Sequence, residues 1–156
     1  MSIVQQARDA LQRATAPEKL DVSEGRQRLT SELAAVDSLA VGFTTFTLAT
    51  DSLSGATTDE LKRLGEKLSA RLTYLLEPIS AIEIDREGCV LQMRSNPPQR
   101  DDDQTTYYEL VLRRGGEMRL SRYSKAPGDA RQKTIATVTR EVFLRLVADF
   151  AAVAPQ

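Results

Sequence analysis

The chain has 156 residues, of which 41% are hydrophobic and 28% are charged, and its formal net charge is -1. This size and composition predict one domain, spanning 1–156, whose core needs neither a disulfide nor a structural metal, and the balanced charge gives no bulk attraction to a polyanion. With no histidine and one cysteine, the sequence excludes histidine acid–base chemistry, an intramolecular disulfide and a cysteine-rich zinc site.

The location and the cofactors of the protein follow from similar absences. The first residues lack the basic start and apolar run of a secretory signal, and no segment approaches the ~20 apolar residues that span a bilayer. We therefore expect a cytoplasmic protein that contacts no membrane and holds no metal or other cofactor.

Residues 1–40 are expected to be helical. The segment 2–14 has apolar residues at helical spacing behind Ser2, a candidate N-cap, and Pro17 then favours a break. The next apolar stripe predicts a second helix over 23–38, and its members are Val22, Leu29, Leu33 and Val36. The segment 41–50 is rich in β-branched and aromatic residues and predicts a strand, with a helix as the alternative.

The segment 57–153 predicts a core of one helix, four strands and a second helix. Thr57 and Glu60 have the spacing of a capping box, and the leucines after them recur at intervals of three and four residues. This helix is expected over 58–76, because Pro78 excludes helical geometry for the residue before it.

Two hairpins follow this helix. In the first hairpin, a turn over 85–88 pairs Ile82 with Leu91. In the second, a loop over 114–116 pairs Leu112 with Met118. We expect these registers because apolar residues then face each other and can be buried together. The connection over 96–104 has prolines and charges and is expected to be exposed and mobile.

The last predicted element is an amphipathic helix over 132–153. Its apolar stripe consists of Ile135, Val138, Val142, Leu146 and Phe150.

These elements predict an α+β fold: a four-stranded antiparallel meander, five-stranded if 41–50 joins it, packed on one face by the 58–76 and 132–153 helices, with additional N-terminal helices. A two-layer sandwich buries the apolar side of each layer. In the order of its elements, the chain is similar to small bacterial secretion-chaperone and adaptor folds. This resemblance rests on element order and implies that a curved sheet and its flanking helices bind a polypeptide.

Candidate catalytic and metal-binding groups are few. The acidic run 101–103 lacks the alternating ligands of a calcium loop and is expected to be a solvated loop. Cys89 has no histidine to activate it and is expected to be a core residue. Glu83 and Glu109 share a predicted sheet face, but nothing marks them as a hydrolytic pair.

One charge pattern in the sequence indicates a candidate binding face. Between Arg113 and Lys133, basic residues exceed acidic ones by five. The candidate binding face consists of Arg94, Tyr107, Val111, Arg113, Arg119, Arg122 and Tyr123. Arginines interleaved with tyrosines can hold phosphates and stack on bases, and they also suit a protein interface with an aromatic centre and an arginine rim.

The leading functional hypothesis is a non-enzymatic protein-binding module of adaptor or chaperone type, with a protein partner or a second copy of itself. The alternative is recognition of an anionic ligand or nucleic acid through the arginine–tyrosine face. An enzyme is the third reading, because no catalytic motif is present.

Overall fold

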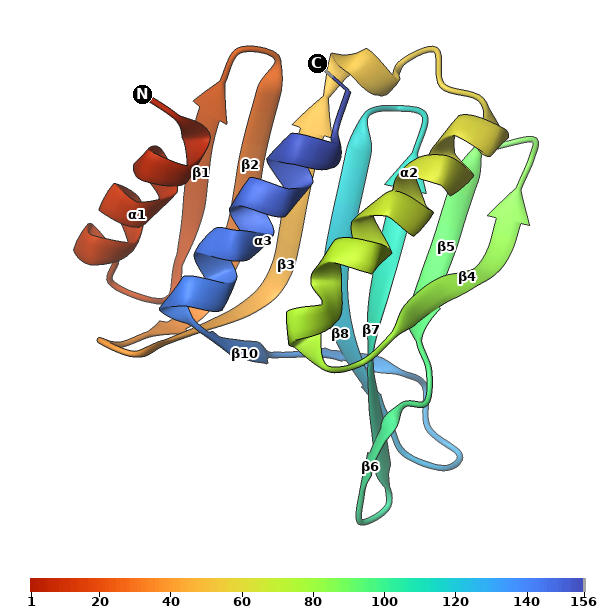
Figure 1. The fold of residues 1–156 in the computed structure, drawn as a ribbon. Coiled ribbons are helices and arrows are strands. Elements are labelled where there is room, and N and C mark those ends of the chain that lie inside the picture. Colours follow the sequence, from red (N-terminus) through yellow and green to blue (C-terminus); the bar gives the residue numbers. More distant parts are fainter. Residues whose placement is uncertain (156) are drawn as a thin grey trace.

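The computed structural model describes residues 1–155 and shows an α+β fold, in which three α-helices lie on one face of a large antiparallel sheet (Figure 1). The helices are α1 (Ile3–Arg13), α2 (Thr58–Arg71) and α3 (Arg140–Val153). The strands are β1 (Glu18–Glu24), β2 (Gln27–Val36), β3 (Ala40–Thr50), β4 (Ile79–Asp85), β5 (Val90–Ser95), β6 (Gln99–Asp101), β7 (Gln104–Arg113), β8 (Glu117–Lys125), β9 (Gln132–Thr134) and β10 (Ala136–Thr139).

The strand order across the sheet is β1-β2-β3-β8-β7-β5-β4, and the short strands β6, β9 and β10 pair with β7, β8 and β3. The predicted α+β class with an antiparallel sheet is confirmed. The predicted size of the sheet is wrong, because the part of the chain that the structure describes forms ten strands instead of four or five.

The N-terminal part differs most from expectation. Helix α1 forms as predicted, and the Ser2 side chain accepts a hydrogen bond from the Gln5 backbone N–H. The predicted helix over 23–38 is wrong, because this segment forms most of the β1–β2 hairpin. Gly25, with φ of +59°, lies in its turn, where a left-handed conformation is needed. The predicted strand over 41–50 is confirmed as β3.

Helix α2 begins where the capping residues predict. The Thr57 side chain accepts a hydrogen bond from the Glu60 backbone N–H, and the α-helix ends at Arg71. A 3₁₀ helix, η2 (Leu72–Leu75), continues it, so that the predicted helix over 58–76 is a composite of two helix types. Another 3₁₀ turn, η1 (Asp51–Leu53), joins β3 to the loop before α2.

The hairpin of β4 and β5 has another register than predicted. Ile84 pairs with Leu91, and the register shifts between Ala81 and Glu83, so that Ile82 lies in a β-bulge and is half-exposed. The turn closes one residue later than expected, and Cys89 adopts the positive φ. Cys89 is buried, as predicted.

The hairpin of β7 and β8 has the predicted register, in which Leu112 pairs with Met118. Its turn touches β3: the Thr50 backbone N–H donates to the Gly116 carbonyl at 2.8 Å, and a Cβ on Gly116 would lie 2.7 Å from the Thr50 carbonyl oxygen. Only glycine fits this close approach. The connection over 96–104 contains the short strand β6, which projects with the first residues of β7 beyond the body of the sheet (Figure 1).

The predicted helix over 132–153 is wrong in its first eight residues. Strands β3 and β8 pair only from Thr45 with Ser121 to Ala49 with Glu117, and β9 and β10 fill the gap beyond by pairing with β8 and β3. Helix α3 begins after Thr139, whose side chain accepts a hydrogen bond from the Val142 backbone N–H.

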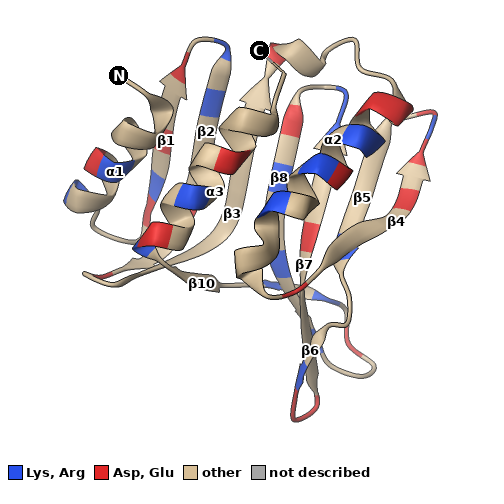
Figure 2. Cartoon of the chain, viewed as in Figure 1, with Lys and Arg blue, Asp and Glu red and all other residues tan. Residues whose placement is uncertain are grey.

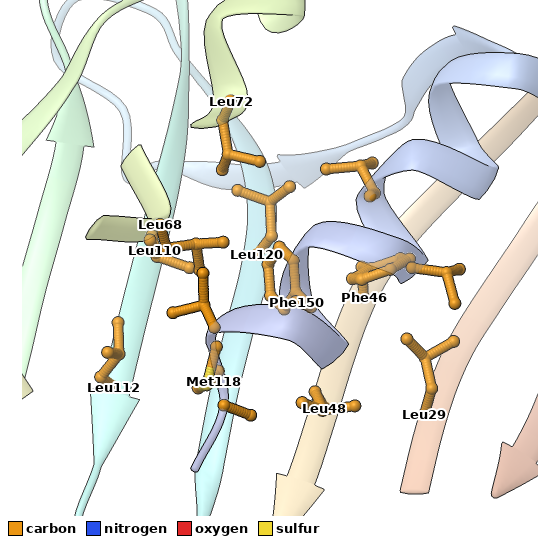
Figure 3. Close-up of a cluster of buried hydrophobic side chains, with 14 of the residues drawn as sticks. Leu29, Phe46, Leu48, Leu68, Leu72, Leu110, Leu112, Met118, Leu120 and Phe150 are labelled. Carbon is orange, nitrogen blue, oxygen red and sulfur yellow. The ribbon is translucent and has the colours of Figure 1, made fainter. Parts of the chain in front are cut away.

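The core lies between the sheet and the helices. Phe46 of β3 contacts Phe143 and Phe150 of α3 with ring centroids 5.4 and 4.9 Å apart, and all three rings are fully buried. Each aromatic pair adds ~0.5–1.5 kcal/mol to the gain from burial. Leu68 and Leu72 close the other half of the core above β7 and β8 (Figure 3). The three α-helices therefore cover one face of the sheet (Figure 1). We call the opposite face, which carries no α-helix, the bare face.

Candidate functional site: the bare face of the sheet

The bare face carries the basic residues of the candidate site. On the helix side, Lys and Arg residues are mixed with Asp and Glu along all three helices, and neither sign dominates (Figure 2). On the bare face, strand alternation gathers six of the seven predicted residues from β5, β7 and β8: Arg94, Tyr107, Val111, Arg113, Arg119 and Tyr123.

Arg122, the seventh predicted residue, lies on the helix side of the sheet. It neighbours Tyr123 in β8, so that the pleat turns it to the opposite face, where its guanidinium carbon lies 4.4 Å from the Tyr108 ring centre. Its Nη2 is 3.0 Å from a carboxylate oxygen of Glu77, and both side chains are about nine-tenths buried. Arg122 is therefore a structural ion-pair partner and does not belong to the candidate face.

Two tyrosines and two arginines form a continuous stack across the bare face. The rings of Tyr107 and Tyr123 stack with centroids 6.0 Å apart. The Arg94 guanidinium lies 4.4 Å from the Tyr107 ring centre, and the Arg131 guanidinium lies 3.9 Å from that of Tyr123. We call these four side chains the stack. Because its arginines and tyrosines occupy one another's faces, neither ring offers a free face to a base.

A buried carboxylate anchors one end of the stack. Glu109 is only 6% exposed, and its Oε2 accepts hydrogen bonds from Arg131 Nη1 at 2.5 Å and from Gln92 Nε2 at 2.7 Å. The hydrogen bond to Glu109 raises the pKa of the Arg131 guanidinium above its usual value. The Arg131 guanidinium and the Glu109 carboxylate neutralise each other. Glu109 therefore holds Arg131 in place and does not form a hydrolytic carboxylate pair with Glu83.

The remaining arginines differ in how far they are paired. Arg119 Nη2 lies 2.9 Å from a carboxylate oxygen of Glu117. Arg113 is exposed and makes no ion pair within residues 1–155. Arg94 has no hydrogen-bond acceptor in the described chain, and its Nε is buried without a partner. Charge on the bare face is thus partly neutralised and partly free.

A groove of about 570 Å³ runs beside the stack. Its walls combine apolar surface with two cationic side chains, and no acidic residue lines it. The side chains that define it are Ile82, Arg94, Pro98, Tyr107, Lys125 and Pro127. This volume is within the ~300–1,000 Å³ that is common for ligand sites, and the mixture of apolar walls with a few polar groups is typical of them.

The groove lies next to β4, one of the two edge strands of the sheet. At the other edge, a side chain of helix α1 covers one residue of β1: the Gln6 side-chain amide donates to the Ser23 carbonyl at 2.7 Å and accepts from the Ser23 N–H at 3.4 Å. No comparable bond covers β4 in the described residues, and the stretch Ser80–Glu83 is exposed. An edge strand left open in this way can pair with an added strand.

Sequence reasoning missed Ile82, Lys125, Pro127 and Arg131 as members of this region. A bulge brings Ile82 there, and the returning loop after β8 brings Pro127 and Arg131; neither has a periodic signal. Lys125 is the last residue of β8, two residues after Tyr123, so that strand alternation could have found it. Only the local excess of basic residues between Arg113 and Lys133 pointed to part of this group.

Other kinds of site find little support in the described residues. Within residues 1–155, no three side chains of the Cys, Asp and Glu types come together as metal ligands, and no helix has the length and apolar character required to cross a membrane. The Cys89 thiol donates to the Ala56 carbonyl at 3.4 Å and packs in the core.

Comparison with known proteins gives no relative: no family model, no curated protein and no solved structure matches this chain.

Proposed function

We propose that this protein is a non-enzymatic cytoplasmic binding module that holds an extended polypeptide along edge strand β4, with part of the polypeptide in the neighbouring groove. The observation that carries the proposal is the contrast between the two edges of the sheet. The Gln6 amide bonds both backbone groups of Ser23 in β1, whereas no side chain bonds the edge of β4 in the described residues, and this edge lies beside a groove of about 570 Å³.

Strand addition explains why the edge and the groove belong together. A peptide that pairs with β4 gains main-chain hydrogen bonds, and its alternate side chains point to the bare face, where the groove lies. The bulge at Ile82 interrupts the edge, so that a short segment on one side of it fits better than a long strand.

The binding test uses peptides selected from a random display library against the immobilised protein. Their affinities are then measured by fluorescence anisotropy for the wild type and for Ile82→Lys, with Leu39→Lys as the matched control, because Leu39 is also an exposed apolar residue but lies in the β2–β3 turn. We expect at least about tenfold weaker binding to Ile82→Lys and unchanged binding to Leu39→Lys.

Hydrogen exchange gives the second readout. The bound peptide should protect the amides of β4 and leave those of β1 unchanged, since the groove lies beside β4 and not beside β1. Failure to select any peptide, or equal affinity for both variants, would overturn the proposal. Light scattering at low and high salt tests self-association: a dimer that persists at high salt and protects β4 would identify a second copy as the polypeptide.

Recognition of an anionic ligand or nucleic acid is the second candidate function, and the unpaired guanidinium of Arg113 favours it. Against it, the rings of Tyr107 and Tyr123 have no free faces for bases. Binding of a single-stranded oligonucleotide that weakens steeply with added salt and is lost in Arg113→Gln would support this candidate.

A further inference from the structure

We infer that the groove selects an acidic segment, in which a carboxylate side chain is flanked by apolar residues. This inference deepens the proposed function and rests on it. Its basis is the charge of the groove: Arg94 and Lys125 line it, no Asp or Glu does, and neither cation makes an ion pair within residues 1–155.

Arg94 is the better placed of the two cations. Its guanidinium lies 4.4 Å from the Tyr107 ring centre, so that stacking holds it in position before a ligand arrives. A guanidinium without an acceptor in the protein can direct its Nη groups to a carboxylate, and such charge-assisted bonds are roughly twice as strong as neutral ones. Because Arg94 is already held in position, binding of a carboxylate costs little side-chain conformational entropy.

Lys125 adds a second positive charge at the other wall, next to Pro127. It is exposed and flexible, and it contributes attraction at longer range without a fixed geometry. The apolar walls formed by Ile82, Pro98 and Pro127 then suit the residues that flank the carboxylate.

A second groove of similar size does not share this charge imbalance. Between helix α2 and Pro155 lies a groove of about 580 Å³, nearly the same volume. Its charged lining residues are two acids and two bases, namely Glu60, Arg63, Glu66 and Lys67. That groove has no preference for either sign, whereas the groove beside β4 presents positive charge alone.

The test compares three libraries of synthetic peptides, seven residues long and acetylated. The first has Glu at its centre between Leu, Ile or Val and an amidated C-terminus. The second is identical but has Gln at its centre. The third also has Gln at its centre and a free C-terminal carboxylate. The affinities of the three libraries are measured by competition against the labelled peptide selected above.

We expect the Glu library to bind at least about tenfold more tightly than the amidated Gln library, with a difference that shrinks as salt is added. Arg94→Gln should remove this difference, and Lys62→Gln, an equal charge change on the exposed surface of α2, should retain it. Because loss of Arg94 also changes the contact with Tyr107, Lys125→Gln serves as a second variant and should reduce the difference.

Each outcome separates the inference from the proposed function. Equal binding of the Glu and Gln libraries overturns the acidic preference and leaves polypeptide binding intact. A preference for the third library over the first also overturns it, because the groove would then recognise a chain terminus. If no library binds and β4 gains no protection from exchange, both the inference and the proposed function fail.

Discussion

Substitution of Gly65 by alanine sets two opposing effects against each other in helix α2. Alanine is more favourable than glycine inside a helix by ~1 kcal/mol. Yet a Cβ at this position would lie 2.6 Å from Met93 Sδ and 2.7 Å from Leu91 Cδ2, where an ordinary contact is 3.4–4 Å. Both neighbours are 1% exposed, so that neither can move into solvent.

The packing effect should prevail. Overfilling of a well-packed core costs ~1–3 kcal/mol, and two contacts that are each about 1 Å too short place this site in the upper part of that range. We therefore expect Gly65→Ala to lower the free energy of unfolding by about 1–2 kcal/mol, which for a chain of this length corresponds to a drop in Tm of ~2–8 °C.

Urea unfolding followed by circular dichroism measures the effect, as a change in the midpoint at constant slope. A double-mutant cycle with Met93→Ala isolates its cause. Met93→Ala opens space for the new methyl group and for Leu91, so that Gly65→Ala should stabilise the protein in this background. Stabilisation by Gly65→Ala alone would refute the reasoning, because helix propensity would then outweigh the close contacts.

Three further predictions concern the core, a turn and the buried ion pair. Phe46→Ala should lower the free energy of unfolding by about 4 kcal/mol in a urea titration, because it leaves a cavity among the phenylalanines. The control Thr47→Ala, on the bare face of the same strand, should lower it by under ~1 kcal/mol. Similar losses in the two variants would contradict this prediction. Hydrogen bonds from two backbone N–H groups of the β2–β3 turn lower the pKa of Asp37, so that its stabilising effect is complete well above the unfolded pKa of 3.8 and is lost as the pH falls through the lowered pKa. The difference in urea midpoint between wild type and Asp37→Ala should thus shrink from pH 6 to pH 2, and a constant difference would speak against it. Glu77→Ala should cost ~3 kcal/mol by leaving a buried guanidinium unpaired, and Arg122→Met should recover part of this loss in the double variant; additive losses in thermal unfolding would show that the two side chains are not coupled.

The β1–β2 hairpin shows why apolar periodicity alone misread a strand as a helix. The inward positions of β2 are Gln27, Leu29, Ser31 and Leu33, and two of the four are polar. Ser31 donates to the Thr45 carbonyl at 2.7 Å, and the Gln27 side chain donates to the Ala151 carbonyl at 3.0 Å. These bonds allow polar side chains to be buried in the strand. In the sequence, however, the two polar residues interrupt the alternation of apolar and polar positions, and the remaining leucines, Leu29 and Leu33, are four residues apart, as in a helix.

The register of the β7–β8 hairpin was predicted correctly because the inward residues next to its turn are apolar, and the turn itself is rich in glycine. These residues are Leu110, Leu112, Met118 and Leu120. For the same reason, alternation placed six of the seven candidate residues on one face. The stack could not be predicted in full, because Arg131 reaches it from the loop after β8. Nor could the groove, which depends on the bulge at Ile82 and on Pro127.

The pairing of β3 with β8 has a consequence for the order in which the chain folds. Strands β1 to β3 are local in sequence and can form their hairpins early, but Thr45 finds its partner Ser121 only after the whole intervening segment has been made. Helix α3, which covers the phenylalanines of β3, comes later still. During synthesis, the N-terminal hairpins therefore expose Phe43 and Phe46, a surface prone to aggregation until the C-terminal helix docks on it.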